Sequence, residues 1–347
     1  MSGGLVASPQ PPAEGYDLAL VDLDGVAYRG PEPIEHAAAS LTTARARGMR
    51  LVFVTNNASR EPGTVAEHLS GLDIPTTPEE VMTAAQACAQ LLLTRLAPGS
   101  RVLVVGGAGL LTAVREAGFT VVSSADDDPV AVAQGFALEV GWTQLAEAAY
   151  AVQRGAWHVA SNRDLSIPTA RGTAPGNGSL VAAVVAATGV EPASAGKPEP
   201  TMYHLAVQRA GARRVLVVGD RLDTDLAGAR GGGYDGLHVL TGVSSARDAV
   251  LAPPHLRPHL LGADLRALLV RHPVPVPGAE GWWTCRAAAA RVVDGRLELR
   301  GPTRVSADDD LEPAVDVARA ACAAVWAAVD EGRAVDPVSV PDLVVTS

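Results

Sequence analysis

Three short runs of apolar residues, each followed directly by polar ones, lie at residues 18–21, 51–54 and 215–218. None of them alternates with polar residues, which is typical of strands buried on both faces of a parallel sheet. Residues 34–47 and 202–209, which precede the second and third runs, are helix-like. Strands separated by helices in this way predict an α/β fold with a doubly wound, Rossmann-like parallel sheet as its core.

A second alternation of strand-like and helix-like segments fills residues 77–176. A block of this length has enough residues for a hydrophobic core of its own. We therefore expect it to be an α/β cap domain inserted into a core formed by residues 16–76 and 177–270. Residues 1–15, which are rich in proline and small residues, we expect to be a disordered tail.

The pattern changes after residue 270, where closely spaced prolines indicate an extended linker. Beyond it, Asp294-Gly295 separates two strand-like runs and favours a tight hairpin turn. Residues 311–329 are alanine-rich and helix-like. We therefore expect residues 271–347 to form a small α+β extension, a regulatory or packing module that Trp282-Trp283 anchors against the core.

A glycine-rich turn, Gly106-Gly107-Ala108-Gly109, follows a strand-like run of the predicted cap. It lacks the third glycine of a dinucleotide-binding loop, because Leu110, Leu111 and Thr112 come next. We therefore interpret it as an ordinary strand-to-helix turn.

Composition limits the class of protein. The formal net charge is −10, and no cluster of basic residues stands out, which argues against nucleic-acid and anionic-membrane partners. No apolar run approaches the roughly 18 residues that span a bilayer, and we expect no signal peptide. Cys88, Cys285 and Cys322 lie far apart, without the spacing of a disulfide framework or a zinc site. These features predict a cytoplasmic protein.

Four polar segments carry the candidate chemistry, and three of them follow the apolar runs directly. They are Asp22-Leu23-Asp24-Gly25, Thr55-Asn56-Asn57, Gly196-Lys197-Pro198 and Gly219-Asp220-Arg221-Leu222-Asp223-Thr224-Asp225. Carboxyl ends of parallel strands are where ligands bind in such sheets. Lys197 is the only lysine among 28 basic residues, either by chance or because a compact ammonium is needed there and a guanidinium does not replace it.

The acidic residues suit phosphoryl transfer. A carboxylate nucleophile splits the reaction into two steps through an aspartyl phosphate, and Mg²⁺, which prefers oxygen ligands, offsets the repulsion between carboxylate and phosphate. Asp22 is suited to be nucleophile and metal ligand. Asp24 is suited to exchange protons with the leaving oxygen while its backbone carbonyl binds metal. Asp220 offers a second carboxylate, with Asp225 in support.

The remaining residues suit the phosphoryl oxygens. The Thr55 hydroxyl and the backbone amide of Asn56 are donors, and Lys197 adds positive charge. Each segment alone is equally well a turn or a helix cap. Their combination predicts a phosphate-handling metal site.

In order and spacing, the four segments resemble the four motifs of the haloacid dehalogenase-like superfamily. They resemble its 4-nitrophenyl-phosphatase-type branch, which has a large α/β cap between the second and third motifs. The resemblance covers about residues 16–269. It implies Mg²⁺ as cofactor, a small phosphate ester as substrate and a cap-to-cap homodimer. It also implies that Asp22 is the nucleophile and Asp24 the acid/base residue. Thr55 and Lys197 would bind phosphate, and Asp22, Asp24 and Asp220 would bind the metal, assisted by Asp225.

With its extension, the chain is similar to bacterial members of this branch that hydrolyse glycerol 3-phosphate and carry an acetyltransferase-like tail. Residues 271–347 lack a pyrophosphate-binding loop, so we expect no second active site there. The resemblance places substrate selection in the cap, at residues 161–164 and 171–179. Relatives often carry an aspartate where this chain has Ala137, which weakens any assignment of substrate by analogy.

Three alternatives remain open. One is the same chemistry on pyridoxal phosphate, phosphoglycolate or a nucleotide monophosphate. Another is a non-catalytic, ligand-sensing protein of the same fold. A third is a phosphomutase, which shares Asp22 and Asp24.

Overall fold

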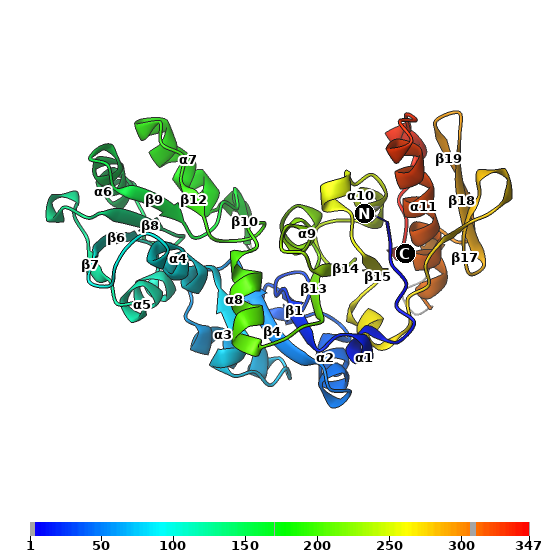
Figure 1. Ribbon diagram of the computed structural model, residues 1–347, viewed down its shortest axis with the longest axis horizontal. Helices are drawn as coiled ribbons and strands as arrows, with labels where there is room; N and C mark the ends of the chain where they lie inside the picture. The colour runs from blue at the N-terminus through cyan, green and yellow to red at the C-terminus, as the bar shows by residue number, and fades with distance from the viewer. Residues whose placement is uncertain (1–3, 170, 306–309, 347) are drawn as a thin grey trace. The chain divides into compact units, whose positions relative to one another are not determined.

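The computed structural model describes residues 4–169, 171–305 and 310–346. By its contacts the chain divides into two compact units, Met1–Leu51 with Ala210–Ser347, and Val52–Arg209 (Figure 1). The division passes through one strand, because β4 (Arg50–Thr55) begins in the first unit and ends in the second.

The first unit contains parallel strands in the order β15-β14-β13-β1, with the start of β4 next to β1. Strands β1 and β13 are buried along their whole length, as predicted for residues 18–21 and 215–218. Side chains on both faces are covered, which explains their continuous apolar runs. The strands of this sheet are β1 (Leu18–Val21), β13 (Val215–Gly219), β14 (Asp235–Val239) and β15 (Leu260–Gly262).

Short helices and a small ribbon complete this part of the first unit. The α-helices are α1 (Pro12–Gly15), α2 (Ala37–Ala46), α9 (Ala227–Gly231) and α10 (Ala246–Val250). The ribbon pairs β2 (Tyr28–Arg29) with β3 (Glu32–Pro33). The single-turn helices are η3 (Leu222–Leu226), η4 (Pro254–Leu256) and η5 (Leu265–Leu269).

The start of the chain is ordered from residue 4, against the prediction of a disordered tail over residues 1–15. The Val6 N–H donates to the His259 carbonyl at 2.9 Å. Ser8 and His272 exchange backbone hydrogen bonds of 3.0 and 3.1 Å. The prediction was wrong for these residues because their backbone partners lie more than 250 positions further along the chain, where composition gives no sign of them.

The extension is an antiparallel sheet covered on one face by a long helix (Figure 1). The hairpin between β18 and β19 turns at Asp294-Gly295, whose φ angles of 48° and 76° are those of the predicted tight turn. The elements are β16 (Val276–Pro277), β17 (Trp283–Cys285), β18 (Ala288–Val293), β19 (Arg296–Arg300) and α11 (Glu312–Asp330), followed by η7 (Pro337–Ser339). The α+β character of the extension is confirmed.

Helix α11 shares one hydrophobic core with the parallel-sheet part of the first unit. Leu222 and Leu226 of η3 belong to the same buried cluster as its inward side chains. Trp326 is 2% exposed, and its indole Nε1 donates to the carbonyls of Ala249 and Val250, both at 3.1 Å. Trp326 is therefore the anchor of the extension.

The predicted anchor, Trp282-Trp283, is only partly right. Trp283 packs against the edge of the shared core. The guanidinium groups of Arg291 and Arg300 instead lie over the ring of Trp282, at 4.6 and 3.9 Å from its centroid. Trp282 thus binds arginines of its own sheet and not the core.

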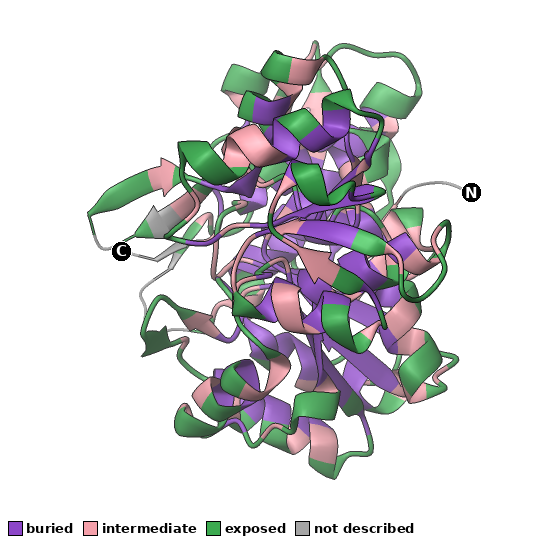
Figure 2. Cartoon of the chain, turned by 90° about the vertical axis from the view of Figure 1, so that its left-hand side faces the viewer, coloured by how far each residue is buried: buried purple, intermediate pink, exposed green. Residues whose placement is uncertain are grey.

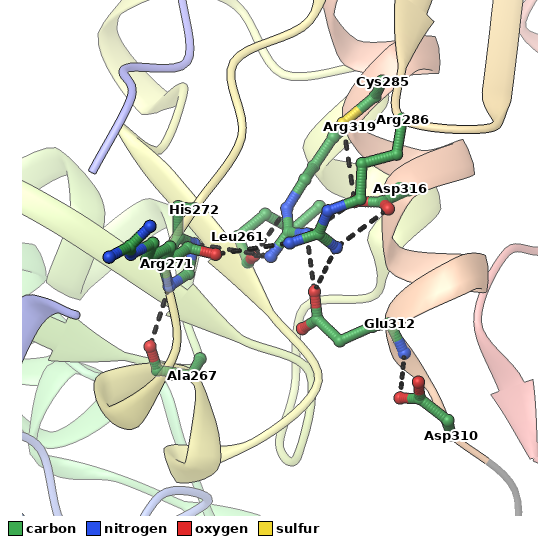
Figure 3. Close-up of polar contacts among 10 residues, drawn as sticks. All are labelled: Leu261, Ala267, Arg271, His272, Cys285, Arg286, Asp310, Glu312, Asp316 and Arg319. Atoms are coloured by element: carbon green, nitrogen blue, oxygen red, sulfur yellow. Dashed lines mark hydrogen bonds and ion pairs between the residues drawn. The ribbon is translucent and has the colours of Figure 1, made fainter. Parts of the chain in front are cut away.

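A buried ion network joins α11 to β15 (Figure 3). Arg319, 1% exposed, donates to the Leu261 carbonyl from Nε and Nη2, at 3.2 and 2.7 Å. It also pairs with Asp316 at 2.7 Å and with Glu312 at 2.9 Å. A guanidinium buried to this degree is tolerated only when its donors have such partners.

The second unit holds a five-stranded parallel sheet in the order β12-β9-β8-β6-β7. In Figure 2 buried residues follow the strands, and exposed ones lie on the outer faces of the helices. The strands are β6 (Arg101–Val105), β7 (Thr120–Val122), β8 (Ala131–Gln134), β9 (Trp157–Ala160) and β12 (Ala193–Ser194). The predicted second α/β sheet is present, and its elements run past residue 176. The boundaries of the cap stay a prediction.

The rest of this unit consists of helices, a ribbon and the pair β4–β5. The strands are β5 (Val81–Thr83), β10 (Ser166–Thr169) and β11 (Gly172–Pro175). The helices are α3 (Pro62–Gly71), α4 (Ala84–Leu93), α5 (Ala108–Glu116), α6 (Trp142–Gln153), α7 (Asn177–Thr188) and α8 (Thr201–Ala210). Within the described ranges, no helix has both the length and the apolar character needed to cross a membrane.

The glycine-rich turn at Gly106 is the predicted strand-to-helix turn, between β6 and α5. Its glycines serve a close approach of chain segments. A Cβ on Gly109 would lie 2.7 Å from the carbonyl carbon of Arg60, and one on Gly107 would lie 3.0 Å from the Ser59 Cα. The turn therefore has a packing reason for its glycines.

Candidate active site

Three carboxylates come together in the first unit at the ends of two neighbouring strands. Asp22 follows β1, Asp220 follows β13, and Asp225 lies in the π-helical turn η3. One oxygen from each lies within 4.8 Å of the others. Asp220 and Asp225 are fully buried, and Asp22 is half-buried. The parallel pairing of β1 with β13 brings the carboxylates together, as the sequence predicted for strand ends.

Backbone donors hold the two buried carboxylates. The Val243 N–H donates to Asp220 Oδ2 at 2.7 Å, and the Arg221 N–H donates to Asp225 Oδ2 at 3.2 Å. Both donors are main-chain N–H groups, so the backbone itself fixes one oxygen of each acid.

Three glycines leave the space that the carboxylates fill. A Cβ on Gly25, whose φ is +86°, would lie 2.5 Å from Asp220 Oδ2. A Cβ on Gly242 would overlap the Asp220 carboxylate, and one on Gly219 would overlap Asp225. A larger residue at any of the three positions would displace an acid.

The donor set fits a hard divalent cation. Oxygen ligands of one Mg²⁺ or Ca²⁺ ion lie about 3 to 5 Å apart, a range that includes the spacing within this group. Three carboxylates this close repel one another strongly where they are buried, and a divalent cation removes that repulsion. Asp22, Asp220 and Asp225 are therefore suited to hold Mg²⁺.

The neighbouring acids differ from the three. The Asp24 side chain is exposed and lies outside the carboxylate group, so a part for Asp24 in metal binding would rest on its backbone carbonyl, the atom that the sequence analysis offered. Asp223 accepts hydrogen bonds of 3.1 and 2.8 Å from Arg221, which lower its pKa. Asp225, predicted only in support, belongs to the group itself.

Lys197 is buried in the second unit, where one asparagine holds its backbone. Asn56 Oδ1 accepts from the Lys197 N–H at 2.8 Å, and Asn56 Nδ2 donates to the Lys197 carbonyl at 3.2 Å. The Lys197 ammonium donates to the Val54 carbonyl at 3.5 Å. Only 4% of the lysine is exposed, so its position is well defined.

Asn56 is itself held by residues that follow β9. Its Nδ2 donates to the Asp164 carboxylate at 3.2 and 3.1 Å, and its carbonyl accepts from Asn162 Nδ2 at 2.7 Å. The sequence placed Asn162 and Asp164 in a segment for substrate selection and did not predict that they hold Asn56. The available signal was that residues 161–164 are another polar cluster directly after an apolar strand.

Thr55 and Arg163, the other predicted residues of this unit, have defined surroundings. Thr55 ends β4, is 7% exposed, and its hydroxyl oxygen accepts from the Asn57 N–H at 3.1 Å. The hydroxyl hydrogen remains available for donation. Arg163, which lies in the segment expected to select the substrate, pairs with Glu191 at 2.8 Å.

Family models and a curated relative match most of the chain. The model described as haloacid dehalogenase-like hydrolase matches residues 19–120, and a HAD-hydrolase-like model matches residues 194–268. The D-glycerol 3-phosphate phosphatase of Mycobacterium tuberculosis is 44% identical over 333 residues, which cover 93% of this chain and 88% of that protein.

Solved structures agree with these matches. The glycerol phosphate phosphatase of Mycobacterium tuberculosis in complex with magnesium has a TM-score of 0.80 and 44% identity, over 92% of each chain. The 4-nitrophenylphosphatase of Thermotoga maritima has a TM-score of 0.69 and 26% identity, over 74% of this chain and 98% of that one. The chain therefore belongs to the haloacid dehalogenase-like hydrolases, in the branch of 4-nitrophenylphosphatase-type enzymes.

Proposed function

We propose that the protein is a Mg²⁺-dependent phosphatase that hydrolyses a small phosphate monoester, glycerol 3-phosphate first among them, through an aspartyl phosphate. The group of three carboxylates, Asp22, Asp220 and Asp225, carries the proposal. Uncatalysed hydrolysis of a phosphate monoester is among the slowest reactions known, so a catalyst must supply on the order of 20 kcal/mol of transition-state stabilisation. A site dominated by charge is suited to that demand.

In this proposal the three carboxylates hold the ion, together with the backbone carbonyl of Asp24. When bound, Mg²⁺ offsets the negative charge of the phosphoryl group as it approaches the acids. Asp22 attacks phosphorus, and the bond from phosphorus to the ester oxygen breaks. Asp24 protonates the leaving oxygen, then takes a proton from the water that attacks the aspartyl phosphate, which releases inorganic phosphate and restores Asp22.

The residues of the second unit are assigned to the phosphoryl oxygens. Lys197 supplies positive charge, and the Thr55 hydroxyl and the Asn56 backbone N–H supply donors. The burial of Lys197 and its fixed backbone support this role, because a preorganised charge stabilises a transition state without reorganising.

Glycerol 3-phosphate is proposed because the relative from Mycobacterium tuberculosis matches nearly the whole chain, extension included. Pyridoxal phosphate, phosphoglycolate and nucleotide monophosphates remain alternatives on the same chemistry. A phosphomutase would use the same acids but pass the phosphoryl group to an organic acceptor.

We also propose that residues 77–176 form the cap that selects the substrate, and that the enzyme is a cytoplasmic homodimer. Light scattering measures the oligomeric state, and a monomer at micromolar concentration would remove the dimer from the proposal.

The test is release of inorganic phosphate from a panel of phosphate monoesters, glycerol 3-phosphate included, with and without Mg²⁺. Asp22→Asn is the matched variant, because it keeps the shape of the side chain and removes the nucleophilic charge. We expect turnover that needs Mg²⁺ and falls by at least about 1,000-fold in Asp22→Asn. Normal turnover in that variant would refute the covalent mechanism, and silence across the panel would favour a ligand-sensing protein.

A further inference from the structure

The loop that follows β14 contacts both segments that carry the acids. This loop, residues 241–244, was assigned no role by the sequence. Its backbone touches Asp220 after β13, and its threonine touches Gly25 after β1. All three segments belong to the first unit. The loop can therefore fix the positions of the two strand ends relative to each other.

The contacts with Asp220 involve both its carboxylate and its carbonyl. The Val243 N–H donates to Oδ2 at 2.7 Å, and the Ser244 N–H donates to the Asp220 carbonyl at 3.1 Å. Gly242 lies so close that a Cβ there would overlap the carboxylate. The carboxylate of Asp220 thus has one oxygen fixed by the loop and one face closed by it.

The contact with the first strand end is a single strong hydrogen bond. The Thr241 hydroxyl donates to the Gly25 carbonyl at 2.6 Å. Gly25 lies at the turn after Asp22 and Asp24, where a Cβ would lie 2.5 Å from Asp220 Oδ2. The Thr241 carbonyl accepts in turn from Arg29. The loop therefore bridges the turn that carries the nucleophile to the strand end that carries the second acid.

The loop has firm support of its own. The His238 ring Nε2 donates to the Ser244 carbonyl at 3.1 Å, from a histidine with no exposed surface. The Ser244 hydroxyl oxygen accepts from the Leu222 N–H at 3.2 Å, at the start of the turn that bears Asp225. With Ser244 held by these two bonds and Thr241 held by its bond to Gly25, the loop does not adjust freely to a displaced acid.

We propose that the 241–244 loop is a positioning segment for the metal-binding carboxylates. Val243 fixes one oxygen of Asp220, Gly242 gives the carboxylate its space, and Thr241 fixes the turn after Asp22. The inference rests on the proposed function only in that the acids hold Mg²⁺. Their contacts are with Asp220 and with the turn after Asp22, so we assign them a positioning role and not a catalytic one.

Two variants test the loop by direct binding of Mg²⁺, measured by calorimetry on the full chain. Gly242→Ala places a methyl group on the Asp220 carboxylate, and Thr241→Val removes one hydroxyl. Thr241→Ser restores that hydroxyl. Gly231→Ala and Thr43→Val are matched controls, since a Cβ on Gly231 meets open space and the Thr43 hydroxyl donates to the Ala39 carbonyl in an exposed hydrogen bond within α2.

We expect Mg²⁺ affinity to fall about 10-fold or more in Gly242→Ala and Thr241→Val, and to return in Thr241→Ser. For Thr241→Val, circular dichroism and melting temperature should match the controls. Phosphate release at saturating Mg²⁺ should recover toward wild type in Thr241→Val, because the defect lies in holding the ion. A purely structural role would lower activity at every Mg²⁺ concentration alike.

Affinity equal to that of the controls in the Thr241→Val variant would overturn the inference, and this variant decides if Gly242→Ala does not fold. Failure of the inference about the loop can be distinguished from failure of the proposed function. Wild type that binds Mg²⁺ but hydrolyses no ester refutes the function and leaves the loop to be judged on affinity. Wild type that binds no Mg²⁺ overturns both.

Discussion

The carboxylates of the first unit and the lysine of the second are held in place by different parts of the chain. Backbone N–H groups of Val243 and Arg221 hold the acids, and glycines leave room for them. Side-chain amides hold the lysine, through Asn56 and the residues after β9. The acidic part therefore depends on having no side chain at a few positions, whereas the basic part depends on having one particular side chain.

This difference has a physical origin. A carboxylate accepts several hydrogen bonds and is satisfied by the N–H groups that loops present. The backbone of Lys197 needs one donor and one acceptor together, which a single amide side chain provides. We therefore expect substitutions of the glycines to weaken Mg²⁺ binding, and substitution of the Asn56 amide to weaken binding of the phosphate ester.

The largest effect is expected where a side chain is added at the acidic part. Gly219→Ala would place a methyl group on Asp225, at the end of a fully buried strand where nothing can move aside. We expect phosphate release to fall at least about 1,000-fold and Mg²⁺ binding to be lost. Titration with Mg²⁺ and a phosphate assay measure both, and near-normal values would show that the glycine requirement is absent.

Lys197→Arg tests whether the basic part tolerates a different cation. The planar guanidinium is larger than the ammonium, and only 4% of the lysine is exposed, so the new group lacks room. We expect activity to fall about 100-fold or more with Mg²⁺ affinity unchanged. Single-turnover phosphate release and calorimetry give the two values. Activity close to wild type would return the single lysine to a chance of composition.

Asn56→Ala removes the amide that holds Lys197 while leaving the lysine itself. Activity should fall about 10-fold, mainly through a higher KM, because the ammonium remains but its position is less defined. Gln144→Ala is the matched control, since its amide accepts from the Gly141 N–H at the start of α6. Steady-state kinetics of both variants decide the matter, and equal values would mean that Asn56 has no part in positioning Lys197.

The smallest expected effect is a change of stability with pH. It arises at His272, which contacts Arg319 of the extension. His272 donates from Nε2 to the Ala267 carbonyl at 2.8 Å and accepts at Nδ1 from Arg319 at 3.4 Å. Burial, with Arg319 beside it, lowers the pKa of His272 to about 4. The imidazole is thus neutral in the folded protein, whereas the unfolded chain protonates near pH 6.5.

Because the unfolded state binds the proton first, stability falls as pH drops from about 6.5 toward 4. His272→Gln keeps a donor and an acceptor but does not titrate. Between pH 7 and pH 5 the variant should lose about 1 to 2 kcal/mol less unfolding free energy than wild type. Urea unfolding followed by tryptophan fluorescence at both pH values measures the difference. Parallel losses would exclude His272 as a source of acid sensitivity.

Much of the fold and the acidic part could be predicted because both depend on local patterns. Continuous apolar runs identify buried parallel strands, and acids directly after them lie at one edge of the sheet. The roles of Asn162 and Asp164 were missed because they depend on contacts more than 100 positions apart, which one sequence does not display. Val243 was missed because its backbone, not its side chain, makes the contact.

The same reasoning explains the errors at the two ends of the chain. Residues 4–15 have a composition typical of a tail, but the backbones of Val6 and Ser8 pair with those of His259 and His272. Trp282-Trp283 stands out in the sequence, yet Trp326, inside a plain alanine-rich helix, makes the bonds to α10. Two adjacent tryptophans are easy to notice in a sequence, but a sequence does not show which residues a tryptophan contacts in the fold.

The shared core of α11 and η3 has a consequence for how the protein opens. Leu222 and Leu226, which flank the turn bearing Asp225, are covered by the last long helix of the chain. Segments that share a core exchange their amide hydrogens in one cooperative opening. We therefore expect the amides of α11 and of η3 to belong to one such unit. A ligand bound to the acids should then also slow hydrogen exchange in a helix that begins about 90 residues later.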